Sequence, residues 1–403
     1  MNPLKITTTK GNIYFNIQPF SLTISEDHKF VYHFDAEGRF SGGFFAGINY
    51  KRGLENQIYT KARDEKSSAI RRFLTLAEKQ EFFADLFKRV SWLRDTLQNS
   101  EYSELLSRLD AILTWDFDKL ESQKELFQTI YQPISILPPD HYLSVVLQIT
   151  EGCTWNQCTF CTFYRGRAFR LKAPAELREH TQKIKNLFGK ALGNRKSLFL
   201  ADANALVIPQ KRLLELLAVI HEEFPIGRSK TKEDHTFDGI YSFLDIFGAE
   251  KKSLADYQEL QQQHVKRIYI GLESGDAEIF AFLNKPGSPE ECLEAVQTIK
   301  KAGISVGIIL LAGVGGAKFA PQHVENSLQF LLQMPLTAED IVYLSPLFAA
   351  NDSEYTQQMQ NLGIVKLTEE EILQQIAEFK TRLKVFGQNR PRVTLYDIRE
   401  FLY

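Results

Sequence analysis

The middle of the chain alternates short apolar runs with longer amphipathic stretches. The runs with strand character cover residues 143–150, 197–202, 239–246, 267–273, 305–313 and 340–347. Between them, apolar residues recur every three or four positions with charged residues in between, which is the spacing of helices that bury one face. Six β-then-α units in series predict an α/β fold, with about six parallel strands that are doubly wound or form a partial or full (β/α) barrel.

The two ends of the chain follow other patterns. Residues 1 to about 60 alternate β-like runs with turn signals, and the "DAEG" at 35–38 predicts a hairpin turn because Gly38 tolerates a positive φ. From about 66 to 130 the pattern is helical, and three prolines in 131–140 indicate a boundary. We therefore predict an N-terminal α+β extension, a core and a C-terminal helical cap, over residues 1–135, 136–350 and 351–403.

The composition and charge of the chain limit which partners and which cellular compartment we expect for the protein. The 403 residues are 44% hydrophobic and 24% charged, with a formal net charge of -2. A balanced charge provides no global field for nucleic acid or an anionic membrane. The N-terminus lacks the basic and apolar pattern of a leader, and no run of about 18 apolar residues occurs. We expect a cytoplasmic protein with no membrane partner.

Three of the four cysteines lie close together in "GCTWNQCTFC", which follows the first predicted strand of the core. Cys153, Cys158 and Cys161 therefore occupy the first β-to-α loop, at the sheet edge where ligands of such folds gather. A structural zinc site needs four ligands, and neither His141 nor Cys292 has the usual spacing for a fourth. Three thiolates suit a [4Fe-4S] cluster with one open iron, while a non-enzymatic scaffold with structural zinc is the alternative.

This cysteine segment, together with "GLESG" at 271–275 and "GIILLAG" at 307–313, resembles the radical SAM superfamily. The usual motif of that family is Cys-x3-Cys-x2-Cys with an aromatic residue before the last cysteine. Phe160 takes the aromatic place, but four residues separate Cys153 from Cys158. The resemblance covers roughly residues 140–350. It implies a barrel in which the three cysteines hold a [4Fe-4S] cluster and the open iron binds S-adenosylmethionine (SAM).

The resemblance also nominates cofactor-binding positions. They are Phe160, Asp202, Glu273, Ser274, Gly275 and Gly313. At the second strand, where the family often has Gly-Gly-Glu, this chain has "ADA" at 201–203. Alternative structural roles are an N-cap at Ser274 or Asp276 and a simple chain turn at Gly313.

Candidates for contact with the substrate lie in the loop after the cysteines and at strand ends. The catalytic candidates are Asp202, Asp245, Arg165 and Arg167. Arginine presents paired donors to a carboxylate or phosphate, although surface ion pairs explain the loop arginines equally well. The resemblance implies an electron donor such as flavodoxin or ferredoxin. An RNA-modifying enzyme of the same superfamily is a further alternative, which predicts a basic groove leading to the cysteine loop.

Overall fold

The computed structural model describes residues 3–8, 11–27, 29–63, 69–97, 102–227, 235–245 and 252–403. It divides into two compact units. Unit 1 comprises residues 1–134, 180–195 and 402–403, and unit 2 comprises residues 135–179 and 196–401. No helix within the described ranges combines the length and hydrophobicity needed to cross a bilayer.

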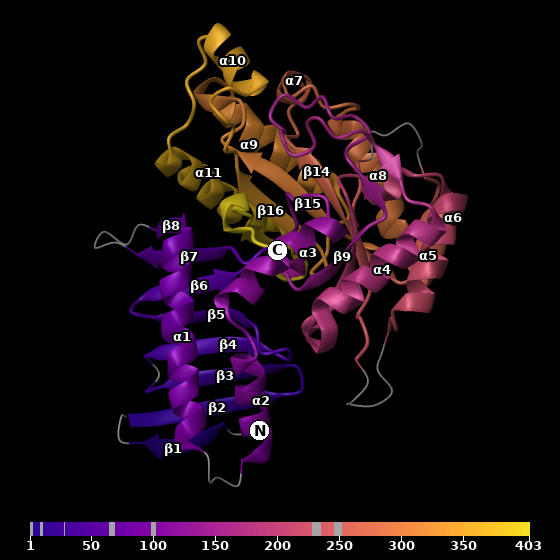
Figure 1. The fold of residues 1–403 in the computed structure, drawn as a ribbon. Coiled ribbons are helices and arrows are strands. Elements are labelled where there is room, and N and C mark those ends of the chain that lie inside the picture. Colours follow the sequence, from indigo (N-terminus) through magenta and orange to yellow (C-terminus); the bar gives the residue numbers. More distant parts are fainter. Residues whose placement is uncertain are drawn as a thin grey trace. The chain divides into compact units, whose positions relative to one another are not determined.

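Unit 1 is built on an antiparallel sheet in which each strand pairs with the next one along the chain (Figure 1). In the described residues its strands are β1 Leu4–Thr8, β2 Gly11–Gln18, β3 Ser21–Glu26, β4 Phe30–Asp35, β5 Phe40–Phe45, β6 Ile48–Arg52, β7 Ile58–Arg63 and β8 Ala69–Phe73. The predicted turn at 35–38 is confirmed, because Gly38 has φ 82° between β4 and β5. Asp35 Oδ1 closes this turn by accepting from the backbone N–H groups of Glu37 and Arg39.

The helical region begins later than the apolar periodicity indicates. Residues 69–73, which we predicted to be helical, form β8 and pair with β7, while residues 66–68 lie outside the described residues. The first helix, α1, spans Leu76–Thr96 and starts at Thr75. Thr75 and Glu78 form a reciprocal capping box there, and this local signal fixes the start of the helix better than hydrophobic spacing does.

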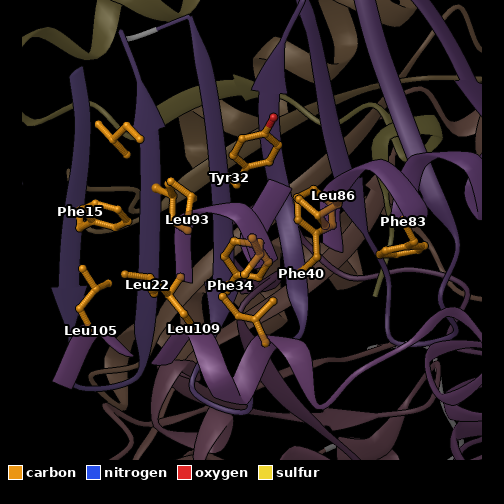
Figure 2. Close-up of a cluster of buried hydrophobic side chains, with 14 of the residues drawn as sticks. Phe15, Leu22, Tyr32, Phe34, Phe40, Phe83, Leu86, Leu93, Leu105 and Leu109 are labelled. Carbon is orange, nitrogen blue, oxygen red and sulfur yellow. The ribbon is translucent and has the colours of Figure 1, made fainter. Parts of the chain in front are cut away.

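Helices α1, α2 (Ser103–Leu113) and α3 (Phe117–Ile130) supply apolar side chains to the core of unit 1. Figure 2 shows Phe15, Leu22 and Phe34 of the sheet facing leucines from the helices, including Leu93 and Leu105. The alternation of buried and more exposed residues along β2 to β4 produces this single buried face.

Arg39 links separate segments of unit 1 by hydrogen bonds, and only 4% of its surface is exposed. Its guanidinium donates to Asp35 Oδ2 at 2.8 Å and to the carbonyls of Leu187 and Phe188 at 2.7 and 2.9 Å. Those carbonyls belong to the last turn of α4 (Pro174–Phe188), so Arg39 satisfies acceptors that the helix itself leaves free.

We expect Arg39→Met to destabilise unit 1 by about 3 kcal/mol, because it removes the guanidinium that donates to Asp35 Oδ2 and to two carbonyls. Hydrogen exchange measured by mass spectrometry should show faster exchange in residues 180–195. Arg94→Met is the control, since the ion pair of Arg94 with Asp110 is solvent-exposed and its loss should change little. Equal exchange rates in the Arg39 variant and the wild type would contradict this expectation.

Unit 2 contains a parallel sheet with the strand order β17-β16-β15-β14-β13-β12-β9 in the described part of the chain. These strands are β9 Ser144–Gln148, β12 Ser197–Ala201, β13 Ile240–Phe243, β14 Val265–Glu273, β15 Ser305–Ala312, β16 Ile341–Pro346 and β17 Arg392–Leu395. All neighbouring pairs are parallel, and β9 and β17 form the two edges, so the sheet is a partial barrel.

The six predicted core strands are confirmed, with ends shifted by a few residues. Residue 246, the predicted end of the third, lies outside the described residues. The seventh strand, β17, comes from the tail that was expected to be helical; it pairs with β16 from Ile341 to Leu344. Its four residues are too few to stand out from the flanking helical pattern.

Helices connect the strands of unit 2 (Figure 1). Besides α4 they are α5 Gln210–Glu223, α6 Leu254–Gln262, α7 Ala277–Phe282, α8 Pro289–Lys301, α9 Gly316–Gln333, α10 Glu354–Asn361 and α11 Glu369–Arg382. A small hairpin of β10 (Thr150–Glu151) and β11 (Arg170–Leu171) brackets the cysteine loop. Short 3-10 turns, η1 to η5, span Pro139–His141, Gly189–Asn194, Ala205–Val207, Leu383–Asn389 and Ile398–Glu400.

Candidate active site

A cavity of about 260 Å³ lies within unit 2, at the C-terminal ends of the parallel strands. Cys153, Cys158 and Cys161 all line it, as the sequence placed them after the first core strand. Phe160, Asp245 and Glu273 line the same cavity, and most of its other lining residues are apolar. The cavity thus occupies the position at which α/β barrels bind their ligands.

The cysteine loop is held by hydrogen bonds to its own backbone. Arg165 donates to the carbonyls of Cys158 and Cys161, at 3.1 and 3.3 Å, and the Cys161 N–H donates to the Cys158 carbonyl. Burial raises the pKa of the Cys158 thiol to about 12, although nearby Lys285 acts in the opposite direction. The pKa of Cys161 is also raised, chiefly by burial. These directions describe thiols without a metal; binding to iron favours the thiolate.

The donor set suits an iron–sulfur cluster, because three soft thiolates face one cavity and one iron would keep an open position. Among the described residues, no group of three or more His, Cys, Asp or Glu side chains is already gathered closely enough to hold a metal ion. A [4Fe-4S] cluster does not need such a group, because each of its three thiolate ligands binds a different iron.

Asp202 supports the cysteine loop. Only 4% exposed, it accepts from the Gly152 N–H at 3.1 Å and pairs with Arg167 at 3.2 Å. Gly152 has φ 75° and directly precedes Cys153, so the carboxylate fixes the entry to the loop. Asp202 is not one of the cavity-lining residues, and its predicted roles in cofactor binding and catalysis stay predictions.

The pKa of Asp202 is raised from 3.8 to about 6 by burial, against the opposing effect of Arg167. The folded state thus holds a proton between about pH 4 and 6 that the unfolded state releases. As the pH rises from about 4 to 6, we expect the free energy of unfolding of the wild type to fall by about 3 kcal/mol relative to that of Asp202→Asn. Above pH 6, the difference between the two free energies should stay constant. Urea unfolding of the metal-free protein at several pH values measures it, with hydrogen exchange of peptides from unit 2 to assign the effect to that unit. A difference that does not vary with pH would contradict the raised pKa.

Glu273 and Lys285 form a buried ion pair in the cavity wall, with 3.4 Å between Oε1 and Nζ. Burial raises the pKa of Glu273, opposed by Lys285. Burial also acts to lower the pKa of Lys285, but Glu273, Asp245 and Cys158 outweigh it and the pKa lies above its usual value. The pair therefore places a carboxylate and an ammonium group in the cavity that the cysteines line.

Sequence analysis did not single out Lys285. It follows α7, a helix of six residues that returns the chain from Glu273 to the same edge of the sheet. The signal in the sequence was the short distance between "GLESG" and "NKPG". This spacing allows one short helix and so brings the lysine back beside the strand end.

Ser274, Gly275 and Gly313 pack against helices and do not line the cavity. Ser274 Oγ hydrogen-bonds His323 Nδ1 of α9 at 2.8 Å, and a Cβ on Gly275 would lie 2.7 Å from backbone atoms of the same helix. Gly313 has φ 89°, and its N–H donates to Gln375 of α11. Asp276 is the N-cap of α7. The predicted cofactor contacts of the first three residues stay untested.

The arginines of the loop have partners inside the protein. Arg167 pairs with Asp202 and also donates to the Phe163 carbonyl, and Arg170 pairs with Glu151 and Glu176. Neither Arg165 nor Arg167 lines the cavity, whereas Asp245 does. The structure thus gives the arginines a role in shaping the loop, and direct binding of an anionic substrate stays a prediction.

Comparison with known structures gives distant likenesses. Coproporphyrinogen III oxidase (HemN) from Escherichia coli is 14% identical, with 66% of this chain and 56% of that chain covered and a TM-score of 0.45. Methylornithine synthase (PylB) is 16% identical, with 59% and 62% covered and a TM-score of 0.40. HydG, a maturase of the [FeFe]-hydrogenase, is 12% identical, with 76% of this chain and 70% of that chain covered and a TM-score of 0.39. This chain spans less than two thirds of the length of the first two.

These TM-scores are too low for the likenesses to bear on fold or function. No curated protein sequence matches the chain. Residues 147–331 match the sequence model of the radical SAM superfamily, and this range contains the cysteine loop and the strands from β12 to β15. Enzymes of this superfamily use a [4Fe-4S] cluster and SAM. Residues 147–331 of this chain therefore form a radical SAM domain.

Proposed function

We propose that this enzyme holds a [4Fe-4S] cluster on Cys153, Cys158 and Cys161, and that it uses SAM to remove hydrogen from a substrate bound in the same cavity. The observation that carries the proposal is the meeting of the three thiols in one cavity at the strand ends of a radical SAM domain. When bound, the cluster supplies one electron, which breaks the C5'–S bond of SAM and gives methionine and a 5'-deoxyadenosyl radical.

The atoms and electrons of the reaction balance with one external reductant. The cofactor chemistry would remove one hydrogen atom from a C–H bond of the substrate, with 5'-deoxyadenosine as the product that carries it away. A protein such as flavodoxin or ferredoxin would provide the electron. The chain's own residues must bind the reactants, orient them and exclude water.

The polar residues that line the cavity support binding of SAM. Glu273 and Lys285 offer a carboxylate and an ammonium group to the charged methionyl end of SAM, and Phe160 offers an aromatic ring to the adenine. Asp245 lines the cavity as well and remains the catalytic candidate with direct access to it. Each of these roles belongs to the proposal.

The rest of the cavity lining is mainly apolar and supports apolar contacts with the substrate. It carries Ile136, Ile309, Leu347 and Phe348, and among the described residues the only cation lining the cavity is the paired Lys285. An apolar lining limits the access of water to a radical.

The test is anaerobic purification, reconstitution with iron and sulfide, and measurement of 5'-deoxyadenosine formed from SAM under dithionite. We expect about four irons per chain and SAM cleavage that depends on the reductant. One zinc per chain with no SAM cleavage would instead support the scaffold alternative and overturn the proposed function.

A further inference from the structure

Helix α10 follows β16 and approaches the cysteine loop from outside the cavity. Within the described residues, those lining the cavity include Ala350 before this helix but none of α10 itself. Even so, Tyr355 in its first turn is only 2% exposed. The burial of this residue results from contacts with two other segments of unit 2.

Tyr355 makes one hydrogen bond to each of these segments. Its backbone N–H donates to the Thr159 carbonyl at 3.2 Å, and Thr159 lies between Cys158 and Cys161. Its hydroxyl oxygen accepts from the Gly315 N–H at 2.9 Å, in the turn that follows β15. One residue thus joins the cysteine loop, through its backbone, to the turn at the end of a core strand, through its side chain.

The turn after β15 needs external support because it is rich in glycine. Gly313, Gly315 and Gly316 have φ values of 89°, 76° and 61°. Glycine has the largest conformational freedom to lose, so such a turn is poorly fixed by its own sequence. A second contact from the same segment helps, since the Ala317 N–H donates to the Val365 carbonyl at 2.9 Å.

Apolar packing strengthens the link. Tyr355, Met359 and Ile364 form one buried cluster with side chains of β15, α7 and α9. Phe160, between Thr159 and Cys161, packs against this cluster while it also lines the cavity. The position of the aromatic ring beside the cysteines therefore depends on α10.

We propose that Tyr355 is a positioning residue. It fixes the cysteine loop relative to the turn at residues 313–317, which we call the glycine turn, and so keeps the cluster and SAM in the correct relative position. This inference rests on the proposed function. Tyr355 acts through Thr159 and Gly315 and does not itself line the cavity. Neither the family match nor the cysteine motif points to this residue.

The test compares Tyr355→Phe with Tyr257→Phe, which removes the same hydroxyl group from a buried tyrosine of α6, a helix that contributes nothing to the cavity. In the first arm, hydrogen exchange is measured on the full chain without metal or SAM. We expect faster exchange in both residues 152–165 and 313–317 of the Tyr355 variant, and in neither segment of the control. Faster exchange in the glycine turn alone would overturn the coupling.

In the second arm, the reconstituted proteins are titrated with SAM, and the change in the electron paramagnetic resonance spectrum of the reduced cluster is followed. We expect Tyr355→Phe to keep its iron and to bind SAM about 3- to 10-fold more weakly, as for one lost hydrogen bond. An unchanged SAM affinity would overturn the positioning role. If the wild type bound no SAM, the proposed function would fail, whereas the first arm would still report on the coupling.

A further measurement uses only the wild type, so its result does not depend on whether a variant folds. In the reconstituted wild type, SAM should slow amide exchange in residues 354–361 of α10, although none of these residues lines the cavity. The exchange of α6 should not change. Absence of protection in α10 when SAM is bound would also overturn the inference.

Discussion

Replacement of Cys153, Cys158 or Cys161 by alanine is expected to abolish SAM cleavage and to reduce the iron content from about four atoms per chain to nearly none. A cluster with one open iron has only three protein ligands, so the loss of one cannot be compensated within the loop. The only other cysteine, Cys292, is completely buried in α8. Iron analysis and the visible absorbance of the reconstituted variants measure the effect.

Cys292→Ala is the matched control for these variants. It removes one thiol from the core of unit 2 and should cost only about 1 kcal/mol of stability, with normal iron content and SAM cleavage. Retention of the cluster in the Cys153 variant alone would show that the wider Cys-x4-Cys spacing excludes that residue from the ligand set. The cluster would then need another ligand.

The second large effect is expected at the opposite end of the barrel. Asp140 lies in η1, just before β9, and accepts hydrogen bonds from Tyr269 and Tyr343, both at 2.6 Å, and from Arg267 at 2.9 Å. These partners come from β14 and β16, so one carboxylate joins the start of the barrel to two later strands. Tyr269 also lines the cavity, which makes this network part of its support.

We expect Asp140→Ala to lower the free energy of unfolding of unit 2 by about 3–5 kcal/mol, because two tyrosine hydroxyl groups lose their carboxylate acceptor and Arg267, which still donates to the Glu339 carbonyl, loses its ion pair. Hydrogen exchange of peptides from β14 and β16 localises the effect to this unit, which a single unfolding curve of a two-unit protein does not. Tyr343→Phe removes one of the three hydrogen bonds and should cost about 1–2 kcal/mol. If the two variants were equally stable, the network would not act as a unit.

Several features of the molecule could be predicted from local patterns. The six core strands are runs of residues buried on both faces, and β9, β12 and β16 are buried along almost their whole length. The turn at 35–38 and the N-cap at Asp276 follow from residues that act within four positions of one another. The placing of three cysteines on one cavity follows from their short spacing in a single loop after a strand.

Other features depend on contacts between segments far apart in the chain. The strands β8 and β17 depend on pairing with β7 and β16, because their own residues give no strong period. Gly275 and Gly313 were assigned to cofactor binding by resemblance, yet α9 and α11 pack closely against them. Sequence spacing cannot tell a glycine that admits a ligand from one that admits a helix.

The sequence by itself determined the parallel α/β core, the cysteine loop at the end of its first strand and the radical SAM chemistry that this loop indicates. Only the tertiary structure decided that Lys285 pairs with Glu273 beside Cys158, that Arg165 and Arg167 shape the loop, and that Tyr355 joins this loop to the glycine turn. The physical reason is the distance along the chain over which each kind of interaction acts. Hydrophobic period and short motifs act between near neighbours, whereas these pairings join segments that meet only when the barrel has formed.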